Sequence, residues 1–407
     1  MIRIGYWMSE KKRKKIDLQQ VADLCRLQGV ETEAVLISLE QDLEEQGPFD
    51  VILHKATDIL VLAEDGDEDA ATSMKGWQSY ISRHPSVLVL DPLDSIAQLI
   101  ARPSTYGVLK QTLASLQDVE TPNFVELTKA DLDVNLTLLK DAGVRFPFVC
   151  KPSRAHGSKI SHKMSIIFNE SGLKDVKPPC VAQTFIKHNA VLHKIFILGD
   201  KHFIVQRPSL KNFSEKDSTL ETIFFNSHDV SKPDSASFLN KLDDSDCKSS
   251  GKEPCGTTIN KLVERVCSQL NSSLIGIDII VENETGVHYI IDVNAFPSYE
   301  GVPNILQLLS DYILQQLFKT SNGRPQHSQE NGFTKKLITN AKDVIKNSLS
   351  MDSKKQGMVN GYSTETRNQE LATSLSKNQV RNETNARNHS TVKGESRNQT
   401  LVNGVYL

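Results

Sequence analysis

The sequence predicts a mixed α/β and α+β protein with three structured domains and a polar C-terminal tail. In residues 1–95, short β-branched runs alternate with stretches of helical period, which is typical of a parallel sheet covered by helices. Two longer β-branched runs, residues 276–281 and 288–297, flank a polar turn and predict a hairpin. After residue 320 the apolar content falls, so residues 321–407 are predicted to form a disordered, low-complexity tail that contains one short helix at 333–345.

Composition limits the classes of function. The chain has 407 residues, 38% hydrophobic and 24% charged, as is usual for a globular protein. Its net charge of -3 provides no overall field for nucleic acid or an anionic membrane, so a polyanion must be held by a local cluster. The six cysteines lack zinc-ligand spacing, and we find no run of apolar residues typical of a membrane span or a secretory leader. We expect a reduced, cytoplasmic monomer that binds neither nucleic acid nor membranes.

Residues 1–95 are predicted to form the first domain. Strands are expected at residues 3–7, 33–37, 50–54 and 86–90. One helix presents an apolar face formed by Leu18, Val21, Ala22 and Cys25. The basic run at residues 11–15, like Lys55, follows a strand end, where open parallel sheets bind ligands. The run has three interpretations: a solvated helix face, a nuclear import signal or an anion site. Its position at a strand end favours the anion site. If the run is an import signal, the protein is expected in the nucleus as well.

Residues 96–190 are predicted to form the second domain. One strand ends at Lys151 and is followed by a small-residue loop that contains His156 and Gly157. A glycine loop permits close backbone approach to nucleotide phosphates, and a neighbouring ammonium supplies charge. By itself this signal is weak, because a lone lysine before a turn is more often a surface residue. The strand expected at residues 178–186 is interpreted as a hinge between two lobes.

Residues 191–320 are predicted to form the third domain, which contains the acidic hairpin. Pairing Glu282 with His288 in this hairpin places Asp278 directly opposite Asp292. Two opposed carboxylates on an apolar sheet repel one another, so their burial requires a cation. Oxygen ligands of this kind suit Mg²⁺, which commonly also binds nucleotide phosphates. Alternatively both acids face water, but each interrupts an Ile/Val run typical of a strand buried on both faces, which favours the metal site.

Two further polar residues of this domain, Asn294 and Lys194, lie within its predicted strands. Asn294 lies two positions after Asp292 and therefore on the same face of its strand. Lys194 lies within an apolar strand, where a charge needs a partner or a ligand.

Several long motifs occur in one order along the chain. They include Gln-Arg-Pro-Ser-Leu-Lys-Asn-Phe at 206–213 and Asp-Val-Asn-Ala-Phe-Pro at 292–297, with others at 5–12, 54–55, 148–151, 155–157 and 224–228. Together they resemble the inositol-tetrakisphosphate 1-kinase family, also called inositol 1,3,4-trisphosphate 5/6-kinases, and the resemblance covers residues 1 to about 318. It implies an ATP-grasp fold, in which ATP lies between two α+β lobes, preceded by a Rossmann-like parallel-sheet domain.

The resemblance implies roles for individual residues. The metal ligands are expected to be Asp278, Asp292 and Asn294. The nucleotide is expected to contact Arg102, Lys151, His156, Gly157, Gln183, Ile186, Lys194, Ser209, Ser227 and Ser231. The inositol phosphate is expected to contact Lys12, Lys55, His162, Lys194, Asn294 and Ser298. The expected catalytic residues are Lys151, Arg207, His162 and Asp292, of which Arg207 is inferred from its place beside Ser209. Ser298 stands where the family commonly has glycine, which affects substrate preference.

These roles predict a kinase that uses ATP as co-substrate and two Mg²⁺ ions. It would phosphorylate inositol polyphosphates, namely inositol 1,3,4-trisphosphate at position 5 or 6 and inositol 3,4,5,6-tetrakisphosphate at position 1. The resemblance also implies reversible transfer, with phosphate exchanged between inositol phosphates through bound ADP. One alternative is an ATP-grasp carboxylate-amine ligase, which needs no polybasic pocket. The other is a non-catalytic inositol phosphate sensor.

Overall fold

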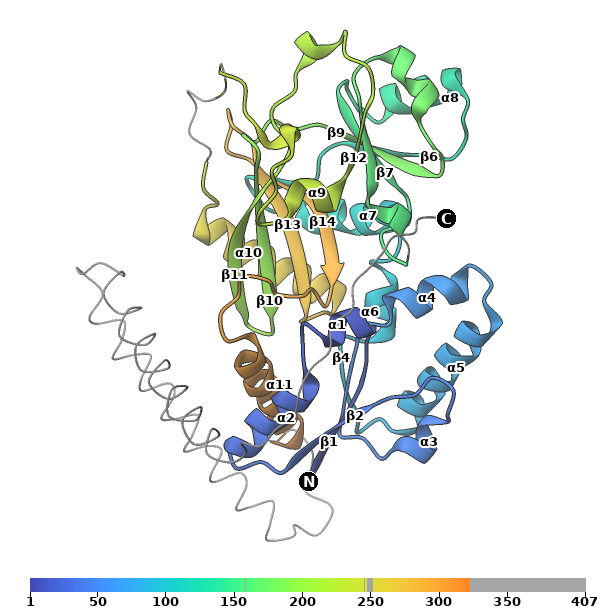
Figure 1. Cartoon of the computed structure of the whole chain (residues 1–407), viewed down its shortest axis with the longest axis vertical. Coiled ribbons are helices and arrows are strands. Elements are labelled where there is room, and N and C mark those ends of the chain that lie inside the picture. Colours follow the sequence, from blue (N-terminus) through green and yellow to red (C-terminus); the bar gives the residue numbers. More distant parts are fainter. Residues whose placement is uncertain (158, 245, 247–251, 323–407) are drawn as a thin grey trace, which may run out of the picture. The chain divides into compact units, whose positions relative to one another are not determined.

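The structure is a computed structural model that describes residues 1–322 except residues 158, 245 and 247–251. The helix predicted at residues 333–345 lies outside the described residues, as does nearly all of the predicted tail, residues 321–407. The described part contains three sheets with helices beside them, as Figure 1 shows.

The first sheet consists of four parallel strands in the order β2-β1-β3-β4. These are β1 (Ile2–Trp7), β2 (Thr32–Leu36), β3 (Val51–His54) and β4 (Leu88–Leu90). The accompanying helices are α1 (Glu10–Arg13), α2 (Leu18–Leu27), α3 (Leu43–Gln46), α4 (Thr57–Glu64), α5 (Glu68–Arg83) and α6 (Leu93–Ala97). The predicted N-terminal parallel sheet is confirmed.

Helix α2 forms where the apolar spacing predicts it. The Asp17 carboxylate caps its N-terminus by accepting hydrogen bonds from the backbone N–H groups of Gln19 and Gln20. The whole predicted apolar face of the helix is buried. Its residues share hydrophobic clusters with Leu309 and Leu314 of α11 (Ile305–Asn322), so the last described helix packs against the first domain.

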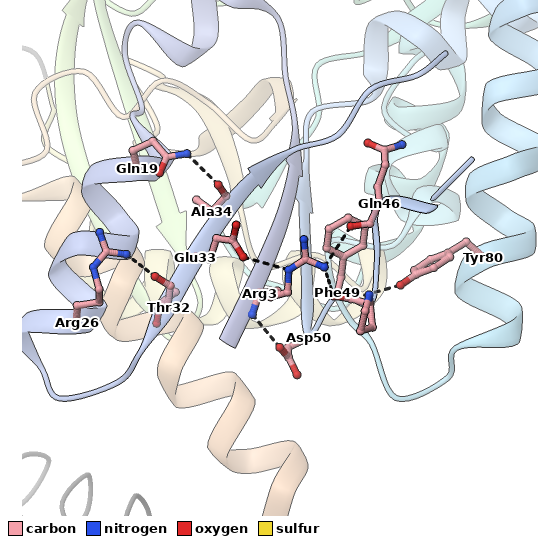
Figure 2. A network of polar contacts seen from close by, with 11 residues as sticks. Arg3, Gln19, Arg26, Thr32, Glu33, Ala34, Gln46, Phe49, Asp50 and Tyr80 are labelled. Atoms are coloured by element: carbon pink, nitrogen blue, oxygen red, sulfur yellow. Dashed lines mark hydrogen bonds and ion pairs between the residues drawn. The ribbon is translucent and has the colours of Figure 1, made fainter. Parts of the chain in front are cut away.

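The first sheet is held in register by polar contacts from Arg3 on β1 (Figure 2). Its Nε donates to the Glu33 carboxylate on β2 at 3.1 Å, and its Nη1 donates to the Gln46 carbonyl before β3 at 3.2 Å. Its backbone N–H donates to Asp50 at 2.8 Å. One residue therefore joins β1 to both neighbouring strands, and the basic residues that follow β1 and β3 emerge at the same edge of the sheet.

The second sheet is antiparallel, with strand order β12-β8-β7-β9-β6. Its strands are β6 (Phe124–Leu127), β7 (Phe148–Pro152), β8 (Lys163–Ile167), β9 (Cys180–Thr184) and β12 (Ile223–Asn226). Helix α8 (Leu132–Asp141) and 3₁₀ turns at Lys159–His162 and Glu170–Asp175 complete this region. The predicted domain boundary at residue 190 stays a prediction. Strand β12 comes after this boundary in the sequence but pairs with β8, which comes before it.

The third sheet has the order β11-β10-β13-β14-β5. Its strands are β5 (Val119–Glu120), β10 (Val191–Leu198), β11 (Lys201–Pro208), β13 (Ile275–Val281) and β14 (His288–Ala295). The remaining elements are α7 (Arg102–Leu113), α9 (Ser227–Ser231), α10 (Gly256–Leu270) and 3₁₀ turns at Glu215–Asp217 and Phe238–Asn240. Leu109 of α7 and Leu262 of α10 pack in one cluster with Ile277 and Ile290. These helices therefore bury one face of the acidic hairpin.

The acidic hairpin forms, with one correction to its register. Asp278 lies directly opposite Asp292, which confirms that prediction. At the turn, however, His288 pairs with Val281, so the predicted pairing of His288 with Glu282 is wrong. A β-bulge next to Asp278, with one extra residue on the second strand, absorbs the difference.

Asp91 fixes the first sheet relative to the hairpin. It follows β4, and its carboxylate accepts hydrogen bonds from the backbone N–H groups of Ser273 at 2.6 Å and Leu274 at 2.9 Å, just before β13. Burial raises the pKa of this carboxyl, although the hydrogen bonds from Ser273 and Leu274 oppose the shift. The edge of the first sheet from which its basic residues emerge is thereby placed near β13, the strand that contains Asp278.

Candidate active site

A cavity of about 1010 Å³ is lined by residues from all three sheets and their loops. Every residue predicted to bind nucleotide, substrate or metal lines it, as does every predicted catalytic residue. These residues come from segments up to 286 positions apart, Lys12 to Ser298, so the fold gathers them. Their individual roles remain predictions, and the contacts below show what each side chain does in the described structure.

The acidic end of the cavity is formed by β13 and β14. Asp278 is only 8% exposed, and burial raises the pKa of its carboxyl, with Lys194 opposing the rise. Its Oδ1 lies 3.1 Å from the Lys194 ammonium but accepts no well-oriented hydrogen bond. The Lys194 ammonium therefore offsets part of the cost of burying this carboxylate, and a metal ion bound here would offset more of it.

The donor set at this end fits Mg²⁺. Asp278, Asp292 and Asn294 offer carboxylate and amide oxygens, which are the ligands that hard cations prefer. Among the described residues, no group of three or more His, Cys, Asp or Glu side chains could hold a metal ion. With two carboxylates and one amide, Asp278, Asp292 and Asn294 supply only part of a coordination sphere, and Mg²⁺ usually completes its own with nucleotide phosphates and water.

Lys151 lies beside the bulge of β14. Ile291 is the residue that the bulge leaves without a strand partner, and its carbonyl accepts a hydrogen bond from Lys151 Nζ at 2.9 Å. Lys151 Nζ also donates to Gln183 Oε1 at 2.7 Å and to the Tyr106 hydroxyl at 3.3 Å. Burial lowers the pKa of Lys151 to about 8, even though Asp292 favours its charged form. The lysine is held at the junction of the second and third sheets.

The predicted hinge lies next to Lys151. Gln183 Nε2 and Thr184 Oγ1 are buried and have no hydrogen-bond partner among the residues that the structure describes. His188 is buried as well, and its ring nitrogens contact the Ile186 carbonyl at 2.6 Å and the Ser209 hydroxyl at 2.7 Å. Burial lowers the pKa of His188 to about 4, so the ring is neutral at pH 7. Unpaired polar atoms beside an apolar wall fit a nucleotide base with its own donors and acceptors.

Arg102 supports the glycine loop. Its guanidinium is 2% exposed and donates to the carbonyls of Pro152, Arg154 and Ser161 at 2.6, 3.0 and 3.3 Å. These carbonyls lie at the two ends of the loop. Arg102 was predicted to contact the nucleotide directly, whereas in the described structure both Nη groups bind the loop and only Nε lacks a partner.

The glycine loop contacts α4 of the first domain. Gly157 has a φ of +87°, and a Cβ added there would lie 2.7 Å from Val61 Cγ1, so only glycine fits without displacement. Arg154 forms ion pairs with Glu64 and Asp65 at the end of α4. The loop is thereby closed onto the first domain at the cavity.

Two imidazoles stack in the same region. The rings of His162 and His228 have centroids 3.7 Å apart, and His162 Nδ1 lies 3.3 Å from the Ser227 hydroxyl. Burial lowers the pKa of His162 to about 4, and His228 adds to the shift. Burial and then Lys55 lower the pKa of His156 to about 3. All these positions are suited to neutral imidazoles at pH 7.

The basic end of the cavity is formed by side chains that repel one another. Lys12 is 5% exposed, lies 4.1 Å from the Phe296 ring centroid and donates to the Pro297 carbonyl. Burial lowers its pKa well below the ordinary value, and Lys55 and Lys15 add to the effect. Burial also lowers the pKa of Lys55. Crowded, desolvated ammonium groups of this kind favour a ligand with several negative charges.

Comparisons with known proteins agree with this geometry. Residues 3–96 match the inositol 1,3,4-trisphosphate 5/6-kinase pre-ATP-grasp domain, and residues 114–315 match the ATP-grasp domain of the same kinases. The inositol-tetrakisphosphate 1-kinase of Xenopus laevis is 44% identical over 332 residues, which are 81% of this chain and 82% of that protein. The chain belongs to the inositol 1,3,4-trisphosphate 5/6-kinase family.

Other relatives of this kinase family extend the match. The inositol-tetrakisphosphate 1-kinase of Danio rerio is 45% identical over 76% of this chain and 78% of that protein. The inositol-tetrakisphosphate 1-kinase 4 of Glycine max is 31% identical over 76% of this chain and 87% of that protein. The predicted ATP-grasp fold is confirmed by the family match. Within the described part of the chain, no helix has the length and apolar character needed to cross a membrane.

Three residues that contact predicted site residues had no role predicted from the sequence. Tyr106 is fully buried and donates to the Ile291 carbonyl at 2.7 Å. His188 binds Ser209, and His228 stacks on His162. Tyr106 and His188 lie outside the motifs that carry the resemblance, so a polar aromatic residue among apolar neighbours was the only available signal.

Proposed function

We propose that this chain is an ATP-dependent inositol polyphosphate kinase that transfers the γ-phosphate of ATP to a ring hydroxyl. The substrates proposed are inositol 1,3,4-trisphosphate, at position 5 or 6, and inositol 3,4,5,6-tetrakisphosphate, at position 1, with reversible transfer. The observation that carries the proposal is one cavity lined by the opposed carboxylates of Asp278, which is buried, and Asp292, and by desolvated ammonium groups such as Lys12 and Lys55. Family membership supports the same conclusion.

The nucleotide is assigned to the space between the second and third sheets. The base fits beside Gln183 and Ile186, where buried polar atoms lack partners. The glycine loop and Lys151 then lie toward the phosphates, where backbone N–H groups and an ammonium offset negative charge. Ser209, Ser227 and Ser231 line the same side and offer hydroxyl groups.

Asp278, Asp292 and Asn294 would hold Mg²⁺, for which we propose two ions. A metal held by these residues would supply positive charge that offsets the negative charge developing during transfer. The chain's own contribution is a pair of carboxylates fixed on adjacent strands, so the ligands need little rearrangement.

The inositol phosphate is assigned to the basic end. Lys12, Lys55, Lys194, His162 and Asn294 all line the cavity, and the charge of Lys194 acts both on Lys55 and on Asp278. Ser298 also lines the cavity here, so its side chain reaches the space where a substrate would bind. Cations from separate elements contact separate phosphates and so fix the orientation of the ring.

In the transfer step, the ring hydroxyl oxygen forms a bond to the γ-phosphorus while the bond from that phosphorus to the ADP oxygen breaks. Lys151 and Arg207 stabilise charge on the transferring group, and the substrate lysines align the acceptor oxygen. The hydroxyl proton leaves to His162, which is neutral at pH 7, or to solvent. Because the transition state is loose, little base catalysis is required.

The test uses purified full-length protein, Mg²⁺, labelled ATP and a panel of inositol phosphates. We expect labelled inositol phosphate product from the wild type and a loss of about 10³-fold or more in Asp292→Ala, which removes a metal ligand. Product formation that is equal in the two proteins would eliminate the metal assignment. Phosphorylation only of a carboxylate, trapped with hydroxylamine, would instead establish a ligase. Binding of inositol phosphates without ATP turnover would establish a sensor.

Three further expectations stay predictions: a monomer, a cytoplasmic location and an additional nuclear location. Size-exclusion chromatography with light scattering and imaging of the tagged chain would test them.

A further inference from the structure

The loop that follows β14, residues 296–301, places a carboxylate at the basic end of the cavity. The Pro297 carbonyl accepts a hydrogen bond from Lys12, and the Glu300 carbonyl accepts one from Arg207 Nη2 at 2.6 Å. The Glu300 side chain also lines the cavity. A negative side chain beside cations that bind phosphate would weaken phosphate binding, so its presence there requires an explanation.

Glu300 forms an ion pair with Lys15, which also lines the cavity. The hydrogen bond from Lys15 is the main cause that lowers the pKa of the Glu300 carboxyl, and the charges of Arg207 and Lys194 add to it. Glu300 is therefore ionised at neutral pH. Both side chains are partly exposed, 39% for Lys15 and 49% for Glu300, so the pair is weak enough for a ligand to break.

The backbone of this loop is fixed, so only the side chain of Glu300 can move aside. Tyr299 has a φ of +53° and is fully buried, and its hydroxyl donates to the Ile197 carbonyl at 2.8 Å. Gly301 has a φ of +93°, and a Cβ there would lie 3.0 Å from Val205 Cγ1. The Glu300 backbone therefore stays beside the basic end of the cavity, so a carboxylate released from Lys15 remains near that end even when it turns toward solvent.

We propose that Glu300 is a specificity-determining residue that occupies Lys15 in the free enzyme and disfavours substrates with a phosphate at this end of the cavity. The inference rests on the proposed kinase function. A phosphate carries more charge than a carboxylate and has more acceptor oxygens, so it displaces Glu300 from Lys15. The displaced carboxylate then repels the phosphate, and this repulsion grows with the number of phosphates nearby. Glu300 thus limits affinity for the most highly phosphorylated inositols.

The primary experiment measures KM for inositol 1,3,4-trisphosphate and inositol 3,4,5,6-tetrakisphosphate in wild type and Glu300→Gln. We expect the variant to lower KM roughly three- to tenfold, with the larger change for the tetrakisphosphate, because one screened negative charge is removed. KM for ATP should remain unchanged. An unchanged or raised KM for both inositol phosphates, or an equal decrease for both, would overturn the proposal.

Two matched variants separate specificity from structure. Glu33→Gln removes an ion pair of similar exposure, 46% for Glu33, that lies between β1 and β2 outside the cavity, and it should leave both KM values unchanged. In a Lys15→Met background, Glu300→Gln should lower KM less than in wild type, because no lysine is freed. An undiminished gain in that background would overturn the role of Lys15.

Failure of this inference can be distinguished from failure of the proposed function. Absence of turnover in the wild type would refute the kinase assignment, and calorimetric titration of the same two inositol phosphates would then test Glu300 by affinity.

If circular dichroism shows that Glu300→Gln does not fold, Glu300→Asp replaces it, because the shorter side chain retracts from Lys15. We expect an intermediate decrease in KM, and no decrease would overturn the proposal.

Discussion

The two ends of the cavity are built in different ways. The acidic end lies on two neighbouring strands of one sheet, with Asp278 directly opposite Asp292. The basic end is assembled from distant segments: Lys12 comes from the first domain and binds the carbonyl of Pro297, 285 positions away. The acidic end is thus preorganised by one hairpin, whereas the basic end depends on contacts between domains. We therefore expect changes at the acidic end to lower kcat and changes at the basic end to raise KM.

The largest effect is expected from Asp278→Asn. The amide keeps the shape of the side chain but removes the charge that would hold the metal, so kcat should fall about 10³-fold. KM for the inositol phosphate should change little. Steady-state kinetics at saturating Mg²⁺ measures both.

The same variant has a second readout without metal. Burial raises the pKa of Asp278, so its charge is unfavourable in the free protein. Urea unfolding in a chelator should therefore give Asp278→Asn a stability equal to or above that of the wild type. A strong loss of stability would mean that the carboxylate is a structural group paired with Lys194.

The second effect concerns how the stability of the protein depends on pH through Lys151, which lies at the junction of the second and third sheets. Burial lowers the pKa of Lys151 to about 8, whereas its pKa in the unfolded chain stays near 10.5. Between these values the unfolded chain binds more protons, so raising the pH stabilises the folded wild type. Relative to Lys151→Met, the wild type should gain roughly 2–3 kcal/mol between pH 8 and pH 10.5. Urea unfolding in a chelator across this range measures the difference, and parallel pH profiles would contradict it.

The third effect tests the basic end through Lys12→Met. The variant removes one ammonium that is expected to contact a substrate phosphate, so KM for the inositol phosphate should rise about 30-fold, a value typical of one charge-assisted contact. The change in kcat should stay within about threefold, because the metal ligands are untouched. Steady-state kinetics separates the two parameters. An equal loss of kcat would show that the two ends do not act separately.

The acidic end could be predicted from the sequence more completely than the basic end. The opposition of Asp278 and Asp292 was predicted from a pairing of Glu282 with His288, which is wrong at the turn, and the bulge at Ile291 restores the predicted opposition. The bulge escaped prediction because no residue pattern marks it, and with it the Ile291 carbonyl that binds Lys151 and Tyr106. These contacts join different sheets, and periodicity carries no information about such pairings.

At the basic end, the sequence identified the lysines but not what holds them. The basic run after β1 was open to three interpretations, because its partners lie almost 300 positions away. Arg102 shows the same limit. Its motif position predicts a nucleotide contact, which stays a prediction, but gave no sign that its guanidinium binds three carbonyls around the glycine loop, which only the folded chain brings together.

The smallest effect is expected from Arg154→Ala, which sharpens the comparison because it changes how the domains meet without touching either end. The ion pairs of Arg154 with Glu64 and Asp65 are exposed, so their loss should reduce stability by less than about 1 kcal/mol. The glycine loop would then be held against α4 mainly by the contact of Gly157 with Val61. KM for the inositol phosphate should rise about twofold and the difference should shrink at high salt, because salt screens the exposed pairs of the wild type. Kinetics at two ionic strengths measures this, and a salt-independent change in kcat would instead assign Arg154 to the transfer step.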